Sequence, residues 1–178
     1  KKEMETFRKY HINAMQFYDW HWKHHRPYCS DAIYYGIFNE TISAQVVKDY
    51  IREVKGIGSK AMFYNLAYGA LKDGKEDGVK PEWQVYIDST DVSPYRHVLK
   101  DGKSDIFIQN PANAEWQDYL VKRTREVYKD FKFDGFHVDQ LGSAPGYHVM
   151  ENGHKVGKAS RLSTKDGKEV LLWDGYSP

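Results

Sequence analysis

The most constraining feature of this sequence is an extended segment, residues 131–142, that follows a helical pattern without a break. It reads Phe-Lys-Phe-Asp-Gly-Phe-His-Val-Asp-Gln-Leu-Gly. Side chains alternate along a strand, so Phe136 and Val138 share one face while His137 and Asp139 share the other. A carboxylate at the carboxyl end of a strand that follows a helix is where a β/α barrel keeps catalytic groups. We therefore interpret Asp139 as a catalytic carboxylate, with a structural Asp that caps the next loop as the alternative.

The rest of the chain repeats this alternation of helix and strand. An apolar stripe at helical spacing over residues 42–55 is followed by an almost continuous apolar run at 60–67. Such a run is typical of a parallel strand buried on both faces. Thr41 or Ser43 can cap the first helix, and Asn113 can cap a second. We expect parallel strands near 11–18, 60–67, 105–109 and 134–139, helices near 3–10, 42–55 and 114–130, and a short strand at 82–87.

These elements predict an α/β fold, a partial (β/α)8 TIM barrel with about four parallel strand–helix units. The 178 residues are enough for one domain but fewer than the roughly 250 of a complete barrel. We expect residues 1–178 to be the front part of the barrel domain of a larger enzyme. Residues 143–178, which are polar and rich in glycine, are then a loop-rich insertion or the start of the next unit.

Composition narrows the function classes. The net charge of +1 gives no electrostatic reason to expect nucleic acid, and no apolar run approaches the length of a membrane span. Aromatic residues make up 15% of the chain, with 14 Tyr and 5 Trp. Tyr and Trp combine an apolar body with a polar tip, which suits the flat C–H faces and hydroxyls of sugars. The alternative for many of them is ordinary core packing.

Three histidines, His21, His24 and His25, lie in a polar and aromatic cluster that ends at Pro27. His21 and His25 could share a helical face, but no neighbouring Glu completes a zinc-protease motif. The single cysteine, Cys29, makes a thiolate metal cluster improbable on composition. We therefore favour a sugar-facing or loop-packing role for the histidines and expect neither a metal nor another cofactor.

Four residues fall at the ends of expected strands, where a barrel collects its site. They are the expected substrate-binding residues Asp19, Trp20, Tyr68 and His137. For Trp20 and Tyr68 the alternative is core packing. Asp134 lies at the start of its strand, five positions before Asp139, and we interpret it as structural.

Three segments together resemble glycoside hydrolase family 66. They are residues 10–27, from Tyr-His-Ile-Asn-Ala-Met to His-His-Arg-Pro; 110–119, Asn-Pro-Ala-Asn-Ala-Glu-Trp-Gln-Asp-Tyr; and 134–142, Asp-Gly-Phe-His-Val-Asp-Gln-Leu-Gly. The resemblance implies a (β/α)8 catalytic barrel and endo-hydrolysis of α-1,6-glucosidic linkages in dextran with retention of configuration. It implies that Asp139 is the nucleophile and that a Glu on a later strand is the acid/base. No motif for that Glu occurs before Pro178, so the acid/base is expected outside this chain and the isolated chain is expected to be nearly inactive.

Two other functions remain open at this point. The family also contains cycloisomaltooligosaccharide glucanotransferases, which share the covalent intermediate with the hydrolases and differ in acceptor access. A non-catalytic carbohydrate-binding fragment would use the aromatic residues without the chemistry. In each case the partner is an α-glucan, and the resemblance implies a bacterial protein that is secreted, periplasmic or at the cell surface.

Overall fold

The computed structural model describes residues 2–85, 94–97, 105–139, 148–151 and 154–158. The chain forms two compact units, one from residues 1–66 with 122–139 and the other from 67–121 with 140–178. Helix α3, Ala114–Asp130, contributes its carboxyl half to the first unit and its amino half to the second. Nothing in the described residues is a helix long and apolar enough to cross a membrane.

A three-stranded parallel sheet forms the centre of the first unit. Its strands are β1 (Ala14–Phe17), β4 (Lys60–Asn65) and β8 (Gly135–Val138), in the order β1-β4-β8. In the register, Ala14 pairs with Lys60 and Asn65 pairs with Val138, so the three strands run the same way with β4 in the middle. The parallel strands expected near 11–18, 60–67 and 134–139 are confirmed.

Helices α1 (Lys2–Lys9) and α2 (Ala44–Gly56) also belong to this unit. The N-cap of α2 is Ser43, whose side chain accepts a hydrogen bond from the backbone N–H of Val46. The chain leaves α2 through Gly58, which has a φ of 85° that suits glycine. The expected apolar stripe of α2 is only partly buried, because Val46 and Tyr50 remain about half exposed.

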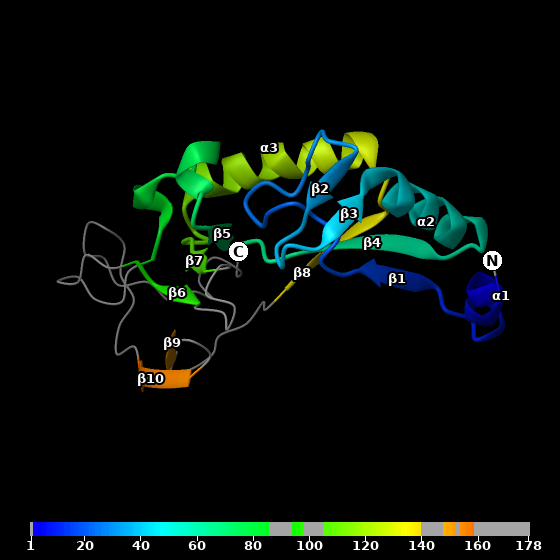
Figure 1. Ribbon diagram of the computed structural model, residues 1–178, viewed down its shortest axis with the longest axis horizontal. Coiled ribbons are helices and arrows are strands. Elements are labelled where there is room, and N and C mark those ends of the chain that lie inside the picture. The colour runs from blue at the N-terminus through cyan, green and yellow to red at the C-terminus, as the bar shows by residue number, and fades with distance from the viewer. Residues whose placement is uncertain (1, 86–93, 98–104, 140–147, 152–153, 159–178) are drawn as a thin grey trace. The chain divides into compact units, whose positions relative to one another are not determined.

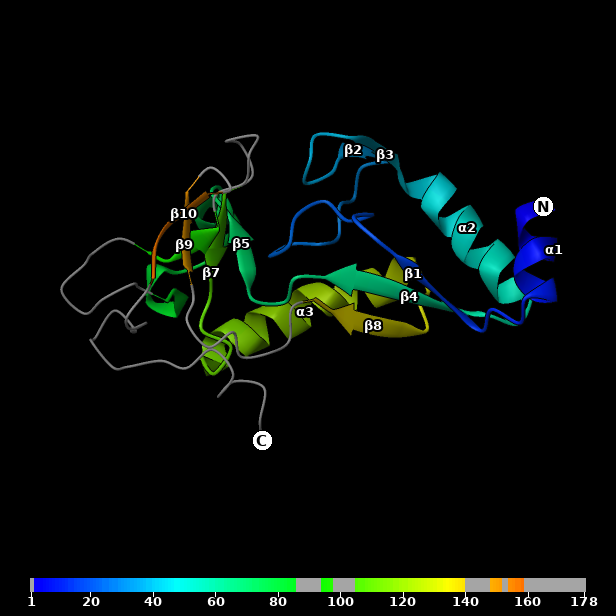
Figure 2. The same cartoon turned by 90° about the horizontal axis from the view of Figure 1, so that it is seen from below.

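Helix α2 and the carboxyl half of α3 cover one face of this sheet (Figures 1 and 2). The core between them contains Val54 of α2, Phe63 of β4 and Val127 of α3, each no more than 2% exposed. Lys48 of α2 also pairs with Asp130 of α3 at 2.7 Å. Each fully buried aliphatic or aromatic side chain stabilises such a layer by about 1.5–3 kcal/mol, so this packing holds the strands in place.

The connection from β1 to α2 contains an antiparallel hairpin of β2 (Ile33–Tyr35) and β3 (Thr41–Ser43). Tyr34 is buried, and its hydroxyl donates a hydrogen bond to the carbonyl oxygen of Trp20 at 2.7 Å. The hairpin is therefore fastened to the segment that follows β1, and it leads directly into α2, as Figure 2 shows.

The second unit has a sheet of its own. Its strands, in spatial order, are β10 (His154–Lys158), β9 (His148–Glu151), β6 (Arg96–His97), β7 (Ile106–Ile108) and β5 (Gly69–Leu71). The strand expected at 105–109 exists as β7, but it pairs antiparallel with both β5 and β6. The expectation of a parallel core strand there was wrong. A run of three or four apolar residues has the same pattern in either pairing, and its partners come from the long excursion between β4 and α3.

Two 3₁₀ helices, η1 (Gly74–Asp77) and η2 (Pro81–Trp83), lie in the same excursion. A strand was expected at 82–87, of which residues 82–85 are described. The expectation was wrong for these residues, because Trp83 ends η2 and Gln84 forms an isolated bridge and no strand. The core here packs Trp83 and Trp116 with Ala70 and Val79. Asn113 caps α3 by accepting the backbone N–H of Trp116 at 3.0 Å, as expected. Of 143–178, only the backbone of β9 and β10 is described.

Candidate active site

Asp139 directly follows β8 and lies level with the carboxyl end of β4. Its backbone N–H donates to the carbonyl oxygen of Asn65 at 3.0 Å, which continues the β4–β8 ladder by one residue. Its side chain is only partly buried, and its Oδ2 accepts a hydrogen bond from the hydroxyl of Tyr64 at 2.9 Å. The backbone of Asp139 is therefore fixed by the sheet, and one carboxylate oxygen is fixed by a side chain of the central strand.

Tyr64 is almost fully buried, with 4% of its surface exposed. Burial, followed by the hydrogen bond to Asp139, raises the pKa of Tyr64 well above its ordinary value. The phenol thus stays protonated at any physiological pH and remains a hydrogen-bond donor. Its ring lies against that of Tyr18, with centroids 4.3 Å apart.

A second carboxyl, that of Asp19, lies within electrostatic reach of Asp139. Burial, then the charge of Glu40, then that of Asp139 raise the pKa of Asp19 to about 6. Its backbone has a φ of 46°, in the left-handed region that Asp tolerates better than most residues. Near neutral pH a fraction of this carboxyl is protonated, so Asp19 can donate a hydrogen bond as well as accept one.

The turn between β2 and β3 positions Glu40. Oε2 of Glu40 accepts the backbone N–H of Phe38 at 2.9 Å. Gly36 makes room for this arrangement, because a Cβ there would collide with the Glu40 carboxyl group. The hairpin therefore places a negative charge near Asp19. The backbone N–H of Phe38 and the missing side chain of Gly36 allow the Glu40 carboxylate to fold back over the turn.

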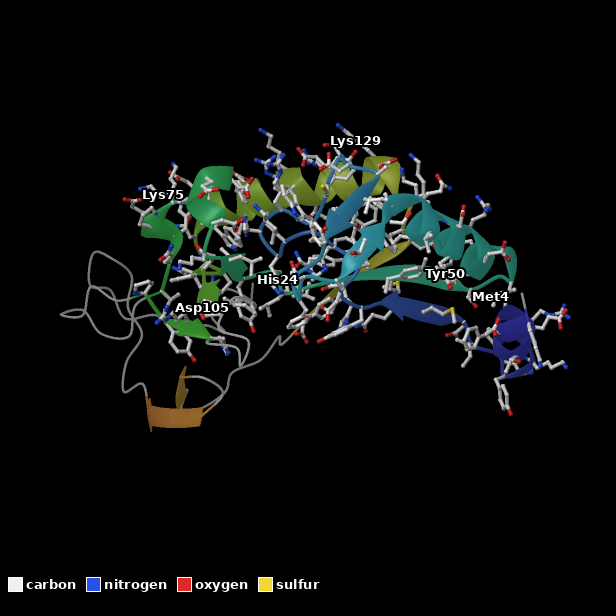
Figure 3. The ribbon with its side chains drawn as sticks, in the orientation of Figure 1. Met4, His24, Tyr50, Lys75, Asp105 and Lys129 are labelled. Carbon is white, nitrogen blue, oxygen red and sulfur yellow. The ribbon has the colours of Figure 1, made fainter. Side chains whose placement is uncertain are left out.

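Behind the carboxyl end of β4 lies a buried polar network of His21, His24 and Asn65. The side-chain amide of Asn65 donates to the carbonyl of His24 at 2.9 Å, and its Oδ1 lies 3.1 Å from Nδ1 of His24. Nδ1 of His24 is also 3.0 Å from Nε2 of His21. Figure 3 labels His24 beside this end of β4. Because Asn65 Oδ1 can only accept, the network assigns the Nδ1–H tautomer to His24.

Both histidines of the network are neutral. Burial lowers the pKa of His24 to about 4, and burial followed by the charge of His24 holds the pKa of His21 well below its usual range. Their facing ring nitrogens are committed to each other and to Asn65. This cluster packs a loop.

Trp20 occupies the core. It is 4% exposed, and its ring packs against Phe63, Phe131 and Phe133 with centroids 4.8–5.7 Å apart. This is the core-packing alternative, since a ring enclosed in this way presents no face to a sugar. The structure thus does not bring Trp20 to the surface beside Asp139.

The other expected site residues lie in different surroundings. His137 is exposed on β8, and its ring centroid is 6.0 Å from that of Tyr64, so it belongs to the neighbourhood of Asp139. Tyr68 is buried in the second unit, where its carbonyl accepts the N–H of Gln109.

Asp134 accepts the N–H of Ala61 at 3.0 Å and pairs with Lys55 at 2.9 Å. These contacts fit the structural role that we inferred for Asp134.

Sequence reasoning did not single out Tyr18, Tyr64, Asn65 or Glu40. The signal for Tyr64 and Asn65 was their place at the end of the 60–67 strand, where their polar tips interrupt an apolar run. We interpreted that run as buried on both faces and so overlooked them. Glu40 could not be found in this way, because only the hairpin brings its charge back toward Asp19.

Comparison with known proteins gives a consistent result. The family model described as glycosyl hydrolase family 66 matches residues 1–176. A cycloisomaltooligosaccharide glucanotransferase of Niallia circulans is 31% identical over 159 residues, which cover 86% of this chain and 16% of that protein. A dextranase of Streptococcus salivarius is 24% identical over 186 residues, covering 99% of this chain and 21% of that protein.

Among solved structures, the chain resembles a cycloisomaltooligosaccharide glucanotransferase of Paenibacillus sp. in complex with cycloisomaltoheptaose. The TM-score is 0.83 at 26% sequence identity, and the match covers 99% of this chain and 24% of that one. The chain thus spans only 16–21% of the length of the curated relatives it matches.

Proposed function

The chain belongs to glycosyl hydrolase family 66, and from this premise we propose that it carries the nucleophile of a retaining α-glucan-cleaving site, with Asp139 in that role. One observation carries the proposal: Asp139 follows the carboxyl end of a parallel strand and has Oδ2 held by Tyr64. We further propose that β1, β4 and β8 are consecutive strands of a (β/α)8 barrel, whose sites lie at the carboxyl ends of its strands.

The chemistry follows the double displacement of retaining glycosidases. Asp139 attacks the anomeric carbon with one carboxylate oxygen as the bond from that carbon to the leaving oxygen breaks. A separate carboxylic acid, expected to be a Glu on a later strand, supplies the proton to the leaving oxygen. Water or a sugar hydroxyl then attacks the anomeric carbon of the glycosyl ester and gives its proton to the same acid/base residue. The bond from that carbon to Asp139 breaks, which regenerates the carboxylate.

The acceptor decides between the two reactions proposed for this site. With water the outcome is endo-hydrolysis of α-1,6 linkages, which is the reaction we favour, with dextran as substrate. With the far end of the same isomaltooligosaccharide the outcome is a cyclic product, and the relatives named glucanotransferases support that second candidate. Linear or cyclic products from dextran, separated by mass, distinguish the two reactions. Because polymeric glucan does not cross membranes, we propose that the protein acts outside the cytoplasm.

Asp19 and His137 are the proposed sugar-contacting residues of this unit, and Tyr68 remains a prediction. Asp19, partly protonated near neutral pH, suits a sugar hydroxyl that both donates and accepts. A purely carbohydrate-binding role is the alternative that needs no covalent step. If the chain only binds glucan, replacing Asp139 by Asn should leave its affinity for glucan unchanged, and neither form should cleave the polymer.

The test is Asp139→Asn in a full-length family 66 enzyme that carries this segment. The amide keeps the size of the side chain but cannot attack carbon, so kcat/KM on dextran should fall by several powers of ten. Asp134→Asn is the matched control, since it neutralises a carboxylate at the other end of the same strand and should lower stability with little change in kcat. Substantial activity in Asp139→Asn would refute the assignment.

A further inference from the structure

Tyr18 and Tyr64 lie side by side between the exposed surface of the first unit and the carboxylate of Asp139. Tyr18 comes directly after β1, and Tyr64 lies on β4, so the two rings meet at the carboxyl ends of neighbouring strands. Their ring centroids are 4.3 Å apart, and the hydroxyl of Tyr64 donates to Oδ2 of Asp139 at 2.9 Å. Tyr18 thus packs on Tyr64, and Tyr64 binds the carboxylate.

The direction of the hydrogen bond between Tyr64 and Asp139 follows from their chemistry. An ionised carboxylate only accepts, so the single hydroxyl proton of Tyr64 is donated to Asp139.

The two tyrosines differ sharply in exposure. Tyr64 is 4% exposed and cannot contact a substrate with its ring, whereas Tyr18 is 63% exposed. One side of the Tyr18 ring packs on Tyr64 and the remainder is open to solvent. Since Trp20 is enclosed in the core, Tyr18 supplies the open aromatic ring in the segment where the sequence had pointed to Trp20.

We propose that Tyr18 and Tyr64 act as a positioning pair for the nucleophile. Tyr64 holds Oδ2 of Asp139 so that Oδ1 is left for attack, and Tyr18 packs on Tyr64 and contacts the bound sugar with its ring. This inference rests on the proposed function for its kinetic consequence, but the hydrogen bond and the ring contact themselves do not. Tyr64 is a positioning residue, because it acts through Asp139 and not on the substrate.

The charged and titratable groups near Asp139 come from two parts of the first unit. In the β1–α2 connection, Asp19 interacts electrostatically with Asp139 and is itself under the influence of Glu40. His24, in the same connection, is neutral. His137 lies beyond Tyr64 on β8.

The direct test is a carbon-13 NMR titration of the Asp139 carboxyl group in the 178-residue chain. Tyr64→Phe should raise the titration midpoint by about one pH unit, because the ionised form loses its donor. Tyr128→Phe is the matched control: its ring contacts Phe63 at 5.7 Å on the helix-covered side, and it should leave the midpoint unchanged. An unchanged midpoint in Tyr64→Phe would overturn the proposal.

Variants at Tyr18 keep the proposal testable if Tyr64→Phe does not fold, since an exposed side chain tolerates replacement. In a full-length family 66 enzyme that carries this segment, Tyr18→Ala removes the ring and should raise KM several-fold. Tyr18→Phe keeps the ring and should raise KM by a smaller factor. If both variants have the same KM, the pair does not work as proposed.

The two proposals fail in different ways. If the midpoint moves in Tyr64→Phe but Asp139→Asn retains activity, the hydrogen bond from Tyr64 to Asp139 exists and the nucleophile has been assigned wrongly. If Asp139→Asn is inactive but the midpoint does not move, the nucleophile stands and the positioning pair is refuted.

Discussion

Asp19 combines two features that lower the stability of the fold. Its left-handed backbone and its raised pKa both cost folding free energy, and strain of this kind concentrates at functional positions. The sequence placed Asp19 at the end of a strand but gave no indication of its ionisation. That property depends on Glu40, which lies 21 positions further along the chain and returns only because of the hairpin.

The first prediction concerns the stability of an Asp19→Asn variant. The pKa of Asp19 is about 6 in the folded state against 3.8 for an ordinary Asp, so its contribution to stability is present below about pH 4 and is lost as pH rises through 6. The full shift corresponds to about 3 kcal/mol for a sheltered group, and solvent screening of this half-buried carboxyl reduces it to about 1 kcal/mol. Asn also tolerates the left-handed backbone, so no new strain is added.

Denaturant unfolding of the 178-residue chain at pH 4 and pH 8 measures this effect. Asp19→Asn should be more stable than the wild type by about 1 kcal/mol at pH 8 and nearly equal to it at pH 4. Asp118→Asn, at an exposed position on α3, is the control for a simple change in net charge. Equal stabilisation at both pH values would show that the ionisation of Asp19 is not the cause.

At the scale of elements, the segment from Trp20 to His25 is fixed in place by side chains from β2 and β4 that bind its backbone carbonyls. Tyr34 and Asn65 each bind a carbonyl oxygen of this segment, and Trp20 inserts into the aromatic core. The pattern of aromatic and histidine residues suggested either sugar contact or loop packing. The described contacts of Trp20, His21 and His24 are those of loop packing. The sequence could not decide between the two roles, because a sequence pattern does not show which rings other elements of the fold will cover.

We therefore predict that the first unit loses stability in mild acid through His24. Its folded pKa of about 4 lies below the ordinary 6.5, so its stabilising contribution is complete above pH 6.5 and is lost as pH falls through 4. For a fully buried side chain this amounts to about 3 kcal/mol. His24→Gln keeps an amide that can bind Asn65 but cannot take up a proton.

The measurement compares the unfolding free energies of wild type and His24→Gln at pH 7 and pH 4. The variant should be less stable at pH 7 and should lose about 3 kcal/mol less than wild type on acidification. His11→Gln, at an exposed position before β1, provides the control. Parallel losses in wild type and His24→Gln would show that His24 does not drive the acid response.

At the scale of the whole chain, the strand and helix periods predicted the parallel order of β1, β4 and β8 and both long helices. They failed at β7, because a three-residue apolar strand carries no information on whether its partners are parallel. The long segment between β4 and α3 was recognised as an excursion, but its own sheet could not be predicted from strands as short as β6. The fourth parallel strand, expected at 105–109, is therefore an antiparallel strand of the second sheet.

The family model matches residues 1–176, and the fold is similar to that of one solved glucanotransferase with a TM-score of 0.83. The account of function depends on a single residue within it. Asp139 is the only residue to which we assign covalent chemistry, and its place after β8 and its bond to Tyr64 are the reasons.

The most direct test of that claim is to trap the covalent intermediate. A full-length family 66 enzyme that carries this segment would be incubated with a fluorinated α-glucosyl fluoride, which slows breakdown of the glycosyl ester, and the labelled protein would be digested and sequenced by mass spectrometry. We predict one glycosyl group per molecule, attached to Asp139 and absent from the Asp139→Asn variant. A label on Asp19 or on any other carboxylate, with Asp139 unmodified, would contradict the account.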